Sequence, residues 1–131
     1  NPVLPPDLVD IALADSDPTL RAALVRGMFR GQGWGKQPPA TILDQLVNDD
    51  APEVRSAVAG VLSYHLTQSQ RQTLADDADA GVVSAIVEDI NINSGTTDAD
   101  LTLLREACGR SLKLSFVANS VCKQLRSIDA N

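Results

Sequence analysis

The chain of 131 residues has the length of one ordinary domain, and a fold of this size buries roughly two thirds of the surface that its unfolded chain exposes. Apolar residues make up 44% of the sequence but aromatic residues only 3%, so the core has to be built from leucine, valine, isoleucine and alanine. The formal net charge of −6 repels phosphate backbones and argues against nucleic acid as a partner.

The first two segments of the chain repeat one another. Placing residue 15 over residue 49 aligns DSDPTLRAAL (15–24) with DDAPEVRSAV (49–58) without a gap. The identical residue pairs include Asp15 with Asp49, Pro18 with Pro52, and Arg21 with Arg55. The apolar positions around them agree as well, which is the signature of a repeated structural unit.

Two weaker copies follow. DADAGVVSAI (77–86) keeps the aspartate and the apolar positions but has Val83 in place of the arginine. In the fourth copy Lys113 replaces the arginine and Ala107 replaces the aspartate. The sequence therefore predicts one helical-repeat domain of about four units, roughly residues 5–37, 38–65, 66–95 and 96–131.

Each unit is expected to form two helices, because its apolar residues recur every three to four positions. Helix starts are indicated by Pro18, by Pro52, by Thr67 with Gln70 as a capping box, and by Thr97 before Asp98 and Asp100. Helix ends are indicated by Gly109 and by residues 93–95. Strand-like alternation is nearly absent, so the chain is predicted to be all-α.

Asp49, in the expected turn between two helices, is followed by the pair Val54-Arg55. Tandem helix pairs with this pattern resemble the HEAT family of helical repeats and its bacterial leucine-rich variant relatives. The resemblance implies an α-solenoid, HEAT- or armadillo-like, of about four stacked helix pairs. It also implies that four residues form a polar ladder inside the stack: Asp15, Arg21, Asp49 and Arg55.

A buried arginine needs a carboxylate within reach, because burying an unpaired guanidinium is costly. We expect Asp49 to supply that carboxylate to Arg55 within the same unit, and Asp15 to supply a carboxylate across the stack. The alternative is that the arginine binds a ligand.

The segment FRGQGWGKQPP (29–39) joins the first two units and contains the only tryptophan, Trp34, and Lys36. It is not a phosphate-binding loop, because the GxxxxGK[ST] pattern is absent and the segment lies between expected helices. It is either a connection in which Trp34 covers a helix end, or a recognition loop, since an aromatic side chain among glycines is typical of a contact hot spot.

Acidic residues concentrate in the third unit, where residues 67–100 carry seven acidic side chains and one basic side chain, Arg71. This is either a solvated face or a surface that attracts a basic segment of a protein partner. The candidate partner-binding residues here are Asp76, Asp77, Asp79, Glu88 and Asp89. The DDADAG run lacks the ligand spacing of a calcium loop, so no metal site is predicted.

Cys108 and Cys122 show no CxxC spacing, and His65 is the only histidine, so the sequence predicts neither a disulfide framework nor a zinc site. We expect two small buried thiols in a reducing compartment. Neither a membrane span nor a signal peptide is visible, which favours the cytoplasm. Because the sequence begins at Asn1 rather than at methionine, a processed or trimmed chain is expected.

No set of residues argues for catalysis, since His65 has no serine, cysteine or acid at a recognisable spacing. The sequence predicts a non-catalytic scaffold or adaptor that binds another protein, without a cofactor. Two alternatives stand beside this prediction. One is a structural subdomain of a larger protein, and the other is a HEAT-like enzyme or lyase that acts on a bound cofactor or nucleic acid.

Overall fold

The computed structural model describes residues 14–30, 40–61, 63–90, 92 and 95–130. Within these ranges the regular secondary structure is helical, and no strand occurs. The elements are α2 (Pro18–Arg30), α3 (Ala40–Val47), α4 (Pro52–Val61), the short 3-10 helix η1 (Ser63–His65), α5 (Gln68–Ala75), α6 (Ala80–Ile90), α7 (Asp98–Cys108) and α8 (Phe116–Asp129). The prediction of an all-α fold is confirmed for this part of the chain.

Short-range signals set the ends of several helices. α4 begins at Pro52, whose missing N–H is not needed in the first turn. At α5 the Thr67 hydroxyl accepts the Gln70 N–H at 3.1 Å and the Gln70 side chain accepts the Thr67 N–H at 2.9 Å, so the predicted capping box forms. Thr97 caps the start of α7 and Gly109 caps its end. These predictions are confirmed.

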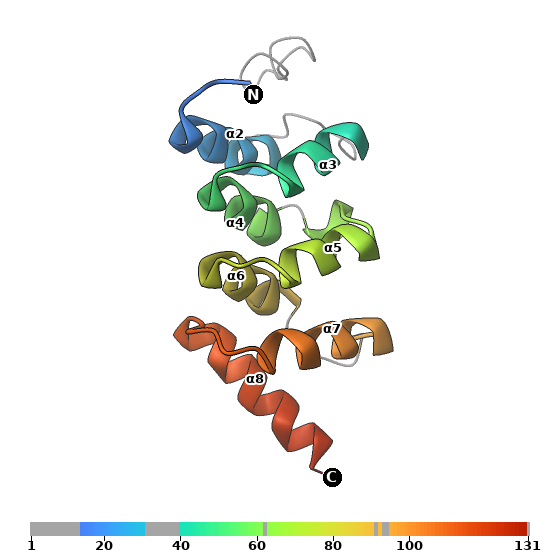
Figure 1. Ribbon diagram of the computed structural model, residues 1–131. Helices are drawn as coiled ribbons and strands as arrows, with labels where there is room; N and C mark the ends of the chain where they lie inside the picture. Colours follow the sequence, from blue (N-terminus) through green and yellow to red (C-terminus); the bar gives the residue numbers. More distant parts are fainter. Residues whose placement is uncertain (1–13, 31–39, 62, 91, 93–94, 131) are drawn as a thin grey trace.

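The helices pack in two parallel series, which Figure 1 shows as two columns. In one series α4 packs on α2, α6 on α4 and α8 on α6, and in the other α5 packs on α3 and α7 on α5. The buried side chains form one continuous cluster of mainly leucine, valine, isoleucine and alanine. Val54 and Val58 of α4 and their counterparts Val82 and Ile86 of α6 are all fully buried. The repeat in the sequence thus corresponds to a repeated position in the packing.

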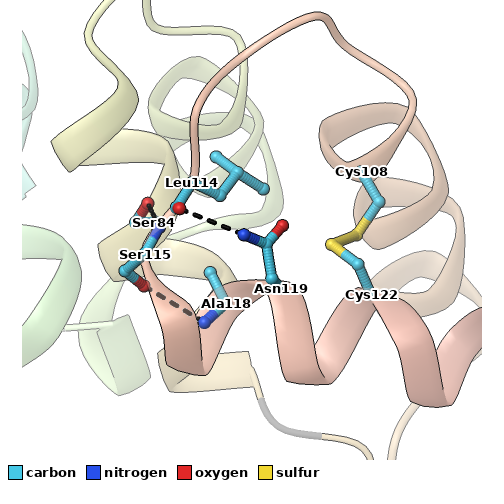
Figure 2. The surroundings of a disulfide bond; sticks show 7 residues. All are labelled: Ser84, Cys108, Leu114, Ser115, Ala118, Asn119 and Cys122. Atoms are coloured by element: carbon cyan, nitrogen blue, oxygen red, sulfur yellow. Dashed lines mark hydrogen bonds between the residues drawn. A yellow bond between two sulfur atoms is a disulfide. The ribbon is translucent and has the colours of Figure 1, made fainter.

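The two cysteines form a disulfide bond, shown in Figure 2. The Cα atoms of Cys108, at the end of α7, and Cys122, on α8, lie 5.6 Å apart. The prediction of two free thiols was therefore wrong. The connection after α7 is tied to α6 by the Ser115 N–H, which donates to Ser84 Oγ at 2.9 Å, and α8 then packs against α7. The disulfide could not be predicted from the spacing of the cysteines, because the two residues come close only when α7 and α8 pack together.

Candidate functional site

Arg21 on α2 connects its own unit to the next one. Its Nη1 donates to the backbone carbonyl oxygen of Asp15 at 2.6 Å. Its Nε and Nη2 donate to the two carboxylate oxygens of Asp49 at 3.0 and 2.9 Å. The exposed Asp50 carboxylate accepts a further hydrogen bond at 3.1 Å. The guanidinium therefore makes a two-pronged contact with the following unit, a geometry that is both strong and specific.

Arg55 on α4 repeats this arrangement one unit later. Its Nη1 donates to the carbonyl oxygen of Asp49 at 2.7 Å, and its Nε and Nη2 donate to the Asp77 carboxylate at 2.6 and 3.1 Å. We call each of these two Arg–Asp pairs, Arg21–Asp49 and Arg55–Asp77, a rung. In both rungs the carboxylate comes from the following unit, so the expected pairing of Arg55 with the carboxylate of Asp49 was wrong.

The turn before each helix explains the direction of the rungs. Oδ1 of Asp49 accepts the N–H of Ala51 at 2.9 Å, and Oδ1 of Asp77 accepts the N–H of Asp79 at 2.9 Å. These bonds hold each carboxylate on its own turn, where the arginine of the preceding unit reaches it. Asp77, which the sequence placed among the partner-binding residues, is instead a rung residue with only 10% of its side chain exposed.

The rungs shift the pKa of Asp49 and of Arg55 toward their charged forms. Burial raises the pKa of Asp49, but hydrogen bonds from Arg21 and from the Ala51 N–H outweigh burial, so the pKa is lowered overall. The hydrogen bond to Asp77 raises the pKa of Arg55, while burial opposes that rise. The Asp49 carboxylate therefore stabilises the fold above its ordinary pKa of about 4, and this contribution is lost as the pH falls through its lowered pKa.

The remaining candidates lie in different environments. Asp79 precedes α6, and its carboxylate accepts a backbone N–H of that helix at 3.1 Å, which gives it a capping role. Asp76 is exposed at the end of α5. Trp34 and Lys36 lie outside the described residues. The acidic residues that lie close together in the sequence therefore have different surroundings and different structural roles.

Glu88 and Asp89, near the end of α6, line a hollow between α4 and α6. Its volume is about 340 Å³, and among the described residues Gly60 and Ala85 line it as well. A Cβ atom placed on Gly60 would have no atom within 4 Å, so this side of the hollow is open. Asp89 also borders a second hollow of about 260 Å³, which extends to residues of α5 and α7. We call the two together the acidic hollow, lined among others by Gly60, Ser63, Arg71, Ala85, Glu88, Asp89 and Asp100.

Asp89 lines both hollows, and it accepts a hydrogen bond from the Ser63 hydroxyl. Burial raises the pKa of Asp89, and Ser63 and the positive charge of Arg71 oppose this only in part. Arg71 Nη1 lies 2.8 Å from Oδ1 of Asp100, yet Arg71 Nε is buried and has no hydrogen-bond partner within the described ranges. A carboxylate that is costly to ionise, beside an unsatisfied polar group, is typical of a functional site.

Sequence reasoning singled out Asp89 through local charge alone. It missed Gly60, Ser63 and Arg71 as neighbours of Asp89, because these residues belong to α4, η1 and α5 and no spacing in the sequence connects them. In the part of the chain that the structure describes, no group of three or more His, Cys, Asp or Glu could hold a metal ion. The arrangement offers a carboxylate-lined recess suited to a cationic group.

Replacement of Asp89 by Asn should raise the melting temperature at pH 7 by roughly 2–4 °C. The pKa of Asp89 is raised in the folded state, so its ionisation destabilises the fold as the pH rises above the ordinary aspartate value of about 4. The asparagine oxygen can still accept the Ser63 hydrogen bond. Thermal melts at pH 7 and at pH 3.5 check this, since the gain should vanish at the lower pH. A lower melting temperature for the variant at pH 7 would contradict it.

Among the described helices, none has both the length and the apolar character needed to cross a lipid bilayer. No protein-family model matches the chain, and neither a curated protein nor a solved structure is significantly similar to it.

Proposed function

We propose that the protein is a non-catalytic scaffold of the α-solenoid type, and that its acidic hollow binds a basic segment of another protein. Two observations support the solenoid. The helices of each series follow one another in chain order, and the rungs at Arg21 and Arg55 repeat with the same geometry. The resemblance of the sequence to HEAT repeats points in the same direction, and stacked repeats offer wide binding surfaces.

The observation that carries the binding proposal is that Asp89 lines both hollows. Its ionised form is disfavoured by burial, so a lysine or arginine side chain of a partner entering the hollow would offset that cost. Glu88 adds a second carboxylate beside it, and the small residues Gly60 and Ala85 leave room for the stem of a long basic side chain.

The disulfide bears on the compartment in which such a partner is met. The expectation of a cytoplasmic protein rested partly on Cys108 and Cys122 being free thiols, and that support is gone. Disulfides persist mainly in oxidising compartments. We therefore propose that the protein meets its partner in an oxidising environment rather than in the cytoplasm.

A lysine-rich decapeptide immobilised on a sensor surface tests the proposal with a defined probe. The wild-type protein should bind it, and the double variant Glu88→Gln/Asp89→Asn should bind at least about tenfold more weakly, because two carboxylates of the hollow lose their charge. Glutamine at residue 88 keeps an oxygen that can accept the Ser115 hydroxyl, which Glu88 binds at 3.1 Å. The binding constants should be measured at low and at physiological salt.

The matched control is Asp76→Asn. This change also removes a negative charge from the third unit, but Asp76 precedes α6, whereas Glu88 and Asp89 lie near the opposite end of that helix. An 11-residue helix is about 16 Å long, so the control charge is remote from the carboxylates of Glu88 and Asp89. We expect less than a twofold change for the control. Equal losses for the control and the double variant would show general charge attraction instead of a site.

A further inference from the structure

Three aspartates begin the same kind of turn in three successive units. In each turn the aspartate Oδ1 accepts the N–H two residues later: Asp15 from Asp17 at 2.8 Å, Asp49 from Ala51 at 2.9 Å, and Asp77 from Asp79 at 2.9 Å. In the first two turns the aspartate carbonyl oxygen also accepts Nη1 of the arginine six residues later, at 2.6 and 2.7 Å. The turns at Asp15 and Asp49 are therefore built alike.

The three turns differ in whether an arginine donates hydrogen bonds to the aspartate carboxylate. Asp49 and Asp77 each receive two N–H groups from an arginine of the preceding unit. The only hydrogen bond that the Asp15 carboxylate accepts from the described part of the chain comes from the Asp17 N–H. Residues 1–13 contain no arginine, lysine or histidine, so their side chains cannot complete a rung at Asp15. Within the described part of the chain, Asp15 thus forms the same turn as Asp49 but has no arginine paired with its carboxylate.

The same end of the stack leaves part of a helix face uncovered. Leu20 of α2 is 48% exposed, whereas its counterparts Val54 on α4 and Val82 on α6 are fully buried. Ala23 of α2 is exposed as well, and its counterpart Ala57 on α4 is buried. α4 is covered by α2 and α6 by α4, but no described helix precedes α2 in this series.

The opposite end of the stack lacks a matching arginine. Alignment of the buried positions of α8 with those of α4 puts Asn119 at the place of Arg55. The sequence alignment that put Lys113 there was therefore wrong, because Lys113 lies in the connection before α8. Nδ2 of Asn119 donates to the carbonyl oxygen of Leu114 at 3.1 Å, as Figure 2 shows. This resembles the contact that Arg55 makes within its own unit, but asparagine is too short to reach a further unit. Ser120 and Lys123 are exposed on that part of α8. Phe116, Val117 and Ile128 of the same helix are exposed as well, so α8 does not have the polar outer surface of a terminal cap.

We propose that Asp15 and the exposed face of α2 form a docking surface for one more arginine-bearing helix from outside residues 1–131, in a unit of the same kind. Such a helix would present a guanidinium to the Asp15 carboxylate and small aliphatic side chains to Leu20, as α2 does for α4. A second copy of this chain docking through α8 is the poorer occupant, because Asn119 stands where the arginine is needed. This surface is independent of the acidic hollow.

A tandem variant tests the proposal. In it, a second copy of residues 15–48 replaces residues 1–14, so that an added α2 with its arginine precedes Asp15 at the spacing found before Asp49. In this tandem protein Asp15→Asn should lower the melting temperature by roughly 5 °C, about as much as Asp49→Asn lowers it in the original protein. In the original protein Asp15→Asn should change it by less than about 1 °C, because asparagine keeps the turn bond to Asp17.

Arg21→Ala in the added copy is the matched control, since it should abolish the further effect of Asp15→Asn in the tandem protein. The helical circular dichroism signal should grow with the added residues. The proposal is overturned if the added copy stays unfolded, or if Asp15→Asn costs nothing in the tandem protein. It is also overturned if, in the original protein, Asp15→Asn lowers the melting temperature as much as Asp49→Asn does. Sedimentation equilibrium of the original protein should give a monomer, and a dimer that Asp15→Asn abolishes would make a second copy the occupant instead.

Discussion

Reduction of the Cys108–Cys122 disulfide should lower the free energy of unfolding by about 3 kcal/mol. The bond closes a loop with a sequence separation of 14 residues, and releasing it restores the conformational entropy of that loop to the unfolded chain. For a protein of this length such a loss corresponds to a fall in melting temperature of roughly 10 °C. Urea unfolding followed by circular dichroism, with and without a phosphine reductant, measures the change.

The reduced protein should nevertheless remain folded at room temperature. The connection between α7 and α8 keeps its hydrogen bonds from Ser115 to Ser84 and from Asn119 to Leu114, and Ala118 is held by the cap at Ser115. The control is the double variant Cys108→Ala/Cys122→Ala, which should unfold like the reduced protein and show no response to reductant. A reduced protein as stable as the oxidised one would contradict the prediction.

Replacement of Arg55 by Ala should lower the free energy of unfolding by about 2 kcal/mol and the melting temperature by roughly 7 °C. The change removes three hydrogen bonds and leaves the Asp77 carboxylate, with 10% of its side chain exposed, without its partner. Because Arg55 connects α4 to the turn before α6, the loss falls on the contact between two units. Thermal and urea unfolding both report it.

Two further variants distinguish the rung from a general effect of charge. Arg105→Ala removes an arginine that pairs with Asp129 on the surface, where the two side chains are 47% and 39% exposed. Exposed ion pairs contribute little, so this variant should shift the melting temperature by less than about 2 °C. Arg55→Lys keeps the charge but cannot make the two-pronged contact with Asp77, and it should fall between wild type and Arg55→Ala. An unchanged melting temperature for Arg55→Ala would assign this arginine to ligand binding instead.

The candidate site was predictable from the sequence only in part. A count of acidic residues indicated the third unit, and Glu88 and Asp89 do line a hollow. The same count could not separate them from Asp77, which is paired with an arginine, or from Asp79, which caps a helix. These acids lie close together in the chain, but their roles depend on what another helix brings to them, and a charge count contains no such information.

The amino-acid sequence by itself determined where several of the helices begin or end and which of their faces are apolar. Caps such as Thr67 and Gln70 act between residues three apart, and the periodicity of the apolar residues acts within one helix, so both are complete in a short segment. Only the tertiary structure decided that Cys108 bonds to Cys122, that each rung carboxylate belongs to the following unit, and that Asp89 lines two hollows. These features depend on contacts between residues of different helices, and such contacts form only when the helices pack together.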